Sequence, residues 1–381
     1  MQDAFARQRT QKTARRRYTI FMSNRNRIAA ALAGFTGMMW LGLTAAVAAN
    51  QRRLVFNPTL EREVENPRSS GHRTRPVVLR TADGTRLSGW LMTPQVQAPH
   101  PAVIYFGGRS EEVSWVVRDA GKLFPGMSVL AVNYRGYGQS HGVPAEIHMI
   151  EDGCMLFDWM AARVAVDARR IAVVGRSLGS GVAVQVAKER PVHSVVLVTP
   201  YDSIVALAKR KFRAMPIDYM LRHRFESIKH APSLKAPTYV LRAADDDIVP
   251  HSHTDQLVAK LAKLCADDVV PGSDHLDIPY LEDTQERIAR FLTAQFAETV
   301  QAVREDGAAV AAAAAADASV SAPAAAALAA VAEVPAPVPA ATLETVVEAA
   351  TTAANDAPIL AASGSDIAPQ TKPDPARPSA S

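Results

Sequence analysis

The sequence Gly175-Arg-Ser-Leu-Gly179 places a serine between two glycines, where an apolar run ends and an alanine-rich segment begins. The run Ile171–Val174 is predicted to be a buried strand, and residues 182–188 to be helical. A serine at such a strand-to-helix turn exposes its Oγ and points a helix N-terminus at the reacting group. Gly175 and Gly179 tolerate the backbone angles and close approach that the turn requires. Ser177 is therefore the candidate nucleophile, and a plain tight turn is the alternative.

A serine hydroxyl becomes a good nucleophile only when a base takes its proton, so a histidine and an acid must follow. His275 comes directly after the last predicted strand, around Asp267–Val270, which is where such a base is expected. Three adjacent carboxylates, Asp245–Asp247, lie in the loop after the preceding predicted strand. The residues alone leave all three open as the acid, and they leave His251 as an alternative base.

Several segments resemble the α/β-hydrolase superfamily, and more narrowly its membrane-anchored serine-hydrolase branch related to serine aminopeptidase-like domains. Besides the strand-to-helix turn at Ser177, which we call the elbow, they are Ala102–Ser110, Asn133–Ser140 and the loop that ends at Pro250. The resemblance covers about residues 52–295. It implies that the acid precedes Pro250 by four positions, which selects Asp246. It also implies a mostly parallel eight-stranded sheet with helices on both faces and a small helical cap.

Acyl transfer places negative charge on the substrate carbonyl oxygen, which must be met by preorganised donors. The expected donors of this oxyanion hole are the backbone N–H groups of Leu178, directly after the nucleophile, and of Arg109, by the register of the resemblance. Relatives often carry His-Gly-Asn where this chain has Gly107-Gly108-Arg109. The side chains of Arg109 and Arg176 are expected to be solvated beside the pocket, or to contact an acidic group of a substrate.

Composition divides the 381 residues into four parts: a basic segment over 1–27, an anchor over 28–49, the hydrolase domain over 52–298 and an Ala/Pro-rich disordered tail over 301–381. The anchor prediction rests on 22 uncharged residues. As a helix they would be about 33 Å long, enough to cross a hydrocarbon core of ~30 Å. A cleaved signal peptide is the alternative. Eight cations precede the stretch and four follow it closely, so the N-terminus is predicted inside and the hydrolase domain periplasmic or extracytoplasmic.

The sequence contains no nucleic-acid motif, dinucleotide loop, phosphate loop or metal-ligand spacing, so neither a cofactor nor a metal is expected. Its two cysteines, Cys154 and Cys265, are expected to be buried thiols. A cap of short, cation-rich helices is expected between Tyr201 and Pro232. The resulting hypothesis is a serine hydrolase that cleaves a small-molecule or lipidic carboxylic ester or thioester. A serine aminopeptidase is one alternative, and a non-catalytic membrane-tethered binding protein is another.

Overall fold

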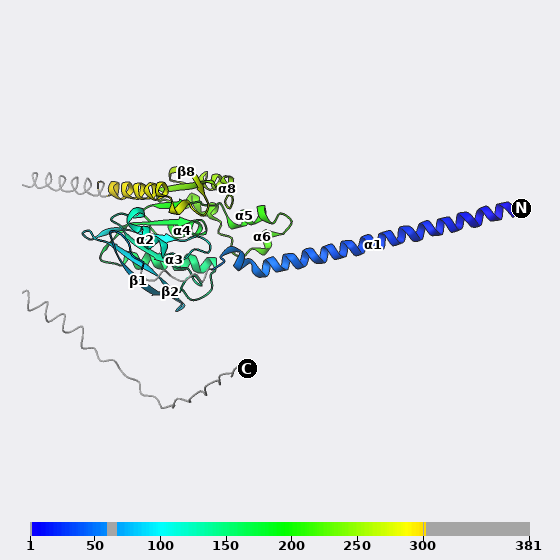
Figure 1. The fold of residues 1–381 in the computed structure, drawn as a ribbon, viewed down its shortest axis with the longest axis horizontal. Coiled ribbons are helices and arrows are strands. Elements are labelled where there is room, and N and C mark those ends of the chain that lie inside the picture. The colour runs from blue at the N-terminus through cyan, green and yellow to red at the C-terminus, as the bar shows by residue number, and fades with distance from the viewer. Residues whose placement is uncertain (1, 59–66, 300, 302–381) are drawn as a thin grey trace, which may run out of the picture. The chain divides into compact units, whose positions relative to one another are not determined.

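The computed structural model describes residues 2–58, 67–299 and 301. The predicted tail therefore lies, apart from Gln301, outside the described residues. The first three of eight strands follow one another directly, and from β3 onward strands alternate with helices (Figure 1). The strands are β1 (His72–Arg80), β2 (Arg86–Pro94), β3 (His100–Phe106), β4 (Ser128–Val132), β5 (Val166–Arg176), β6 (Val195–Val198), β7 (Thr238–Asp245) and β8 (Leu264–Asp274). The helices are α1 (Gln2–Val55), α2 (Trp115–Leu123), α3 (Glu146–Ala161), α4 (Leu178–Glu189), α5 (Ile204–Lys211), α6 (Ile217–Met220), α7 (Ser227–His230) and α8 (His251–Val258), followed by a helix over residues 282–299.

The strands form one sheet in the order β1-β2-β4-β3-β5-β6-β7-β8. Only the pairings of β2 with β1 and with β4 are antiparallel, and all the others are parallel. The predicted mostly parallel eight-stranded sheet is thus confirmed. Because parallel strands end at the same edge, the loops after β3, β5, β7 and β8 meet at the carboxyl edge of the sheet.

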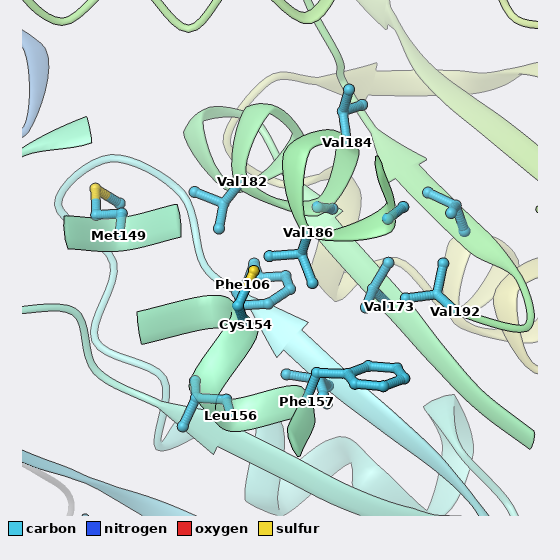
Figure 2. Close-up of a cluster of buried hydrophobic side chains, with 14 of the residues drawn as sticks. Phe106, Met149, Cys154, Leu156, Phe157, Val173, Val182, Val184, Val186 and Val192 are labelled. Atoms are coloured by element: carbon cyan, nitrogen blue, oxygen red, sulfur yellow. The ribbon is translucent and has the colours of Figure 1, made fainter. Parts of the chain in front are cut away.

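Both faces of the sheet are covered, as the uninterrupted apolar strands predict. Along β3, Ala102, Ile104 and Phe106 face one hydrophobic cluster, whereas Val103 and Tyr105 face the other. Helices α3 and α4 cover the first face, and α2 and the 282–299 helix cover the second. Figure 2 shows side chains of α3 and α4 meeting those of the sheet; the labelled residues are Phe106, Met149, Cys154, Leu156, Phe157, Val173, Val182, Val184, Val186 and Val192. Each large side chain buried here contributes about 1.5–3 kcal/mol to the free energy of unfolding.

The predicted cap is present as α5, α6 and α7, which lie between β6 and β7. Helix α1 is longer than the predicted anchor, since it continues to Val55. Its segment Ala29–Val55 is long and apolar enough to cross a membrane, and none of that apolar window is buried inside the protein. A signal sequence near an N-terminus can have the same length and composition.

The two cysteines lie in the predicted kinds of element but differ in exposure. Cys154 is buried on α3, as expected. Cys265 is exposed on β8, so the prediction of a second buried thiol is wrong. The reason is that β8 is an edge strand, and most of its side chains lie at least partly in solvent.

Candidate active site

Ser177 occupies the turn between β5 and α4, with φ 48° and ψ −117°. A positive φ is costly for a side-chain-bearing residue and is held here by its surroundings. The Ser177 amide donates to Val198 O at 2.8 Å, which fixes the turn to β6. A Cβ at Gly179 would lie 2.1 Å from Phe106 O, and one at Gly175 would lie 2.4 Å from Gly179 O. Both elbow positions therefore require glycine, because a methyl group would collide with backbone.

The structure brings Ser177, His275 and Asp246 into one hydrogen-bonded row. The Ser177 Oγ lies 2.8 Å from His275 Nε2. On the other side of the ring, His275 Nδ1 lies 2.8 and 2.9 Å from the two carboxylate oxygens of Asp246. The side chains of His275 and Asp246 are only 4% and 3% exposed. A base that contacts the nucleophile through one nitrogen and an acid through the other can accept and return a proton.

Asp246 differs from its two acidic neighbours in its contacts. Its Oδ1 accepts the amides of Ile248 and Val249 at 3.1 and 2.7 Å, which turns the carboxylate inward. Asp245 and Asp247 are exposed. The alternative base, His251, lies with Nε2 2.9 Å from Ala243 O and is not part of the row.

The amides available for an oxyanion can be found by elimination within the loop after β3. The Gly108 N–H donates to Glu111 at 2.6 Å, and the Ser110 N–H donates to Phe56 O at 3.3 Å. Within the described residues, the amides of Arg109 and Leu178 donate no hydrogen bond to the protein. They are the two amides that the sequence predicts as donors to an oxyanion.

Glu111 is a site residue that the sequence reasoning missed. One of its carboxylate oxygens accepts from Tyr105 Oη and Trp115 Nε1, both at 2.8 Å. The other accepts from Gly108 N–H at 2.6 Å and from Arg176 Nη1 at 2.8 Å. This buried carboxylate therefore fixes the loop that carries Arg109.

Arg176 is not a solvated charge, so that expectation is wrong. Its side chain is 8% exposed, and besides Glu111 it donates to the carbonyls of His275 and Leu276, both at 3.1 Å. Burial alone would lower the pKa of the guanidinium, but the adjacent Glu111 carboxylate raises it above its ordinary value. The pair joins the loop after β3 to the loop that carries His275. Arg109, by contrast, is exposed, and its Nε donates to Leu54 O at 3.1 Å.

A cavity of about 530 Å³ opens beside Ser177. Trp115, Ile248, Leu276 and Tyr280 supply apolar surface to its lining, and Arg109 is the exposed cation among the lining residues. Among the described residues, no three side chains of the metal-ligating types converge.

Comparison with known proteins places the chain in a family. Residues 97–215 match the family model described as serine aminopeptidase, S33. An uncharacterized protein of Mycobacterium tuberculosis is 35% identical over 256 residues, which are 66% of this chain and 90% of that protein. The α/β hydrolase domain-containing protein WAV2 of Arabidopsis thaliana is 25% identical over 66% of this chain and 89% of its own length.

Two further similarities are partial. The lysophosphatidylserine lipase ABHD12 of Danio rerio is 28% identical over 45% of this chain, and the match spans 48% of that protein. Among solved structures, the α/β hydrolase GrgF from Penicillium sp. sh18 aligns with 59% of this chain at 19% identity, with a TM-score of 0.49.

Proposed function

Because this chain belongs to the α/β-hydrolase superfamily, we propose that it is a serine hydrolase that cleaves a carboxylic ester or thioester through Ser177, His275 and Asp246. The observation that carries the proposal is the hydrogen-bonded row from Ser177 Oγ through His275 to Asp246. The positive φ at Ser177 adds support, since a strained turn of this kind is maintained only by its surroundings.

In the proposed reaction, His275 Nε2 takes the Ser177 hydroxyl proton while Oγ attacks the substrate carbonyl carbon. The carbonyl oxygen becomes an oxyanion, which the amides of Leu178 and Arg109 stabilise. The intermediate collapses to an acyl-serine, and His275 returns the proton to the departing alcohol or thiol. Water then attacks the acyl-serine while His275 takes its proton, and the same steps in reverse free Ser177 and the carboxylic acid. Asp246 holds the imidazole in the required tautomer throughout and stabilises its charged form.

The charges around the cavity favour an ester over the free N-terminus of a peptide. An aminopeptidase needs a carboxylate free to meet the substrate ammonium group. Two carboxylates line the cavity, and both are occupied: Glu111 by four donors, and Glu112 by Ser114 and Asn133. The exposed cation Arg109 instead favours an anionic group on the substrate. The relative from Danio rerio is named as a lipase for lysophosphatidylserine, which is an anionic ester lipid. We propose that the substrate of this protein belongs to the same chemical class.

We further propose that α1 is an uncleaved membrane anchor over residues 28–49, with the N-terminus inside. Its apolar window is unburied, as expected for a surface that contacts lipid. The excess of cations before the span gives the orientation. An alkaline phosphatase fused after residue 300 should be active outside the cytoplasm; an inactive but stable fusion would contradict the orientation.

The experiment that tests the hydrolase is labelling with a fluorescent fluorophosphonate, followed by turnover of substrates. Wild-type protein should be labelled, Ser177→Ala should not, and Ser252→Ala, which changes an exposed serine on α8, should behave as wild type. A p-nitrophenyl ester should then be cleaved much faster than an amino-acid p-nitroanilide. Faster cleavage of the anilide would favour the aminopeptidase. A folded wild type that is neither labelled nor active would favour a non-catalytic membrane-tethered binding protein.

A further inference from the structure

The cap contacts α1 within the stretch that is apolar enough to cross a membrane. Trp40 Nε1 donates to Ala214 O at 2.9 Å. About three turns farther toward the domain, Gln51 Nε2 donates to Met220 O at 3.2 Å, and the Arg222 amide donates to Gln51 Oε1 at 2.8 Å. Figure 1 shows α5 and α6 beside the end of α1 that joins the domain. The cap and this half of α1 therefore occupy the same depth along the helix axis.

Helix length shows that this depth lies within a membrane if α1 spans one. Ile28 and Trp40 are 12 residues apart, so only about 18 Å of apolar helix precedes Trp40, which hydrogen-bonds to the cap, at 1.5 Å per residue. A hydrocarbon core is ~30 Å thick, and a tilted helix crosses less depth, not more. Shifting the helix outward until Trp40 leaves the core is unfavourable, because Arg25 and Arg27 would then enter the core. Each arginine placed there would cost roughly 2.5–3.5 kcal/mol. The cap must then share about 12 Å of the apolar layer or of its boundary.

The cap segment 212–221 has the composition of an interfacial element. It reads Phe-Arg-Ala-Met-Pro-Ile-Asp-Tyr-Met-Leu, and its Tyr219 is 93% exposed. Aromatic side chains of this kind favour the boundary between headgroups and acyl chains. The acidic residue of the segment, Asp218, is paired with Lys209 at 2.7 Å. Exposed cations flank the segment on both sides: Lys209, Arg210, Lys211 and Arg222.

We propose that the cap segment 212–221 is a second membrane-contact element, which inserts beside α1 at the boundary of the bilayer and binds anionic headgroups through its flanking cations. The partner is a lipid bilayer, and the inference rests on the proposed anchor. If residues 28–48 fill the hydrocarbon core, Leu54 lies about 9 Å beyond it. Its carbonyl oxygen accepts from Arg109 at the cavity. The active-site opening is thereby placed at the headgroup layer, so a single-chain lipid ester reaches Ser177 from the bilayer.

The test attaches an environment-sensitive fluorophore to the full chain at either of two exposed positions. Tyr219→Cys is compared with Val164→Cys, which is 99% exposed and precedes the amino end of β5, at the edge of the sheet opposite the cap. Both are made with Cys265→Ser, because Cys265 is exposed, whereas Cys154 is buried. The proteins are reconstituted into phosphatidylcholine vesicles that contain doxyl-labelled lipid, with or without phosphatidylglycerol.

Most of the fluorescence at position 219 should be quenched by the doxyl lipid, and none at position 164. Quenching should increase with phosphatidylglycerol, and this increase should disappear in Arg210→Glu/Lys211→Glu but persist in Lys235→Glu/Lys260→Glu, which reverses two exposed cations in the segments that directly precede β7 and β8. If the protein floats with the vesicles but neither position 219 nor position 164 is quenched, the inference is overturned, whereas the proposed anchor still stands. Protein that carbonate extracts from the vesicles would overturn both, whereas fluorophosphonate labelling of Ser177 reports on the hydrolase independently.

Discussion

Replacing Glu111 tests whether a buried ion pair holds the loop after β3 that carries Arg109, the proposed oxyanion donor; we call this loop the oxyanion loop. Its two carboxylate oxygens accept four hydrogen bonds. Glutamine offers one acceptor oxygen and turns an NH2 group toward the other two donors. Glu111→Gln therefore leaves two donors unmatched and leaves Arg176, whose side chain is 8% exposed, without its counter-charge.

The expected loss of stability is that of a broken buried pair, about 3–5 kcal/mol. A typical domain has about 5–15 kcal/mol in total, so the variant should fold, with a Tm lower by roughly 6–20 °C. Activity should fall further than stability requires, because the freed Gly108 amide no longer holds the Arg109 amide in place. Displacing one oxyanion donor costs about 10²–10³ in kcat.

A double-mutant cycle separates the ion pair from the loop. In Glu111→Leu/Arg176→Met neither charge remains unpaired. The double variant should therefore be more stable, by about 1–3 kcal/mol, than the summed stability losses of Glu111→Leu and Arg176→Met predict. Its kcat should stay low, because Gly108 still lacks its acceptor. Urea unfolding gives the stabilities, and turnover of a p-nitrophenyl ester, scaled by fluorophosphonate titration of Ser177, gives kcat. Additive stability losses, or wild-type kcat in folded Glu111→Gln, would refute the reasoning.

Three further changes probe the site and the cap. Asp246→Asn should lower kcat about 10⁴-fold, because the amide holds the wrong imidazole tautomer, whereas Asp245→Asn and Asp247→Asn, which change exposed neighbours, should leave ester turnover near wild type. Gly179→Ala places a methyl group 2.1 Å from Phe106 O and should abolish folded, labelled protein, whereas Gly34→Ala, with nothing within 4 Å, should not; equal yields of labelled protein would contradict the elbow geometry. Burial, Arg52 and Arg222 lower the pKa of His223, whose Nδ1 accepts the Glu146 amide. The stabilisation of the fold by neutral His223 is therefore present above the ordinary pKa of about 6.5, and it is lost as the pH falls through the lowered pKa of the folded state. Urea midpoints between pH 7.5 and 5 should fall more steeply for wild type than for His223→Gln, and parallel slopes would exclude this role.

The elements of the site could be predicted wherever the signal is local. A β-branched run, two glycines and a helical segment predict the turn at Ser177 because all of them lie within a few residues. Asp246 is harder to predict, since three adjacent carboxylates compete and only the family register separates them. What distinguishes it in the structure is a tight turn whose amides at Ile248 and Val249 hold the carboxylate inward.

Glu111 and Arg176 could not be predicted from local signals, because their partners come from distant parts of the chain. Glu111 contacts Arg176, 65 residues away, and Arg176 contacts the carbonyl of His275, 99 residues away. From the sequence alone, a cation beside the nucleophile is expected to be solvated, since arginine is rarely buried without a partner. The partners of Arg176 come close to it only in the folded sheet, where β3, β5 and β8 end at the same edge. The exposure of Cys265 was missed for a similar reason, since an edge position depends on strand order.

The end of α1 connects the proposed anchor to the loop that carries the expected oxyanion donor. Arg109 Nε donates to Leu54 O, the Ser110 amide donates to Phe56 O, and Asn57 Nδ2 donates to Ser110 Oγ. Phe56 is fully buried and packs edge-on against Phe225 of the cap. One short segment thus ties the base of the helix to the oxyanion loop and to the cap. Since a donor misplaced by about 1 Å can cost 10²-fold in rate, we expect the residues after the proposed anchor to help position the proposed oxyanion donor as well as tether the domain.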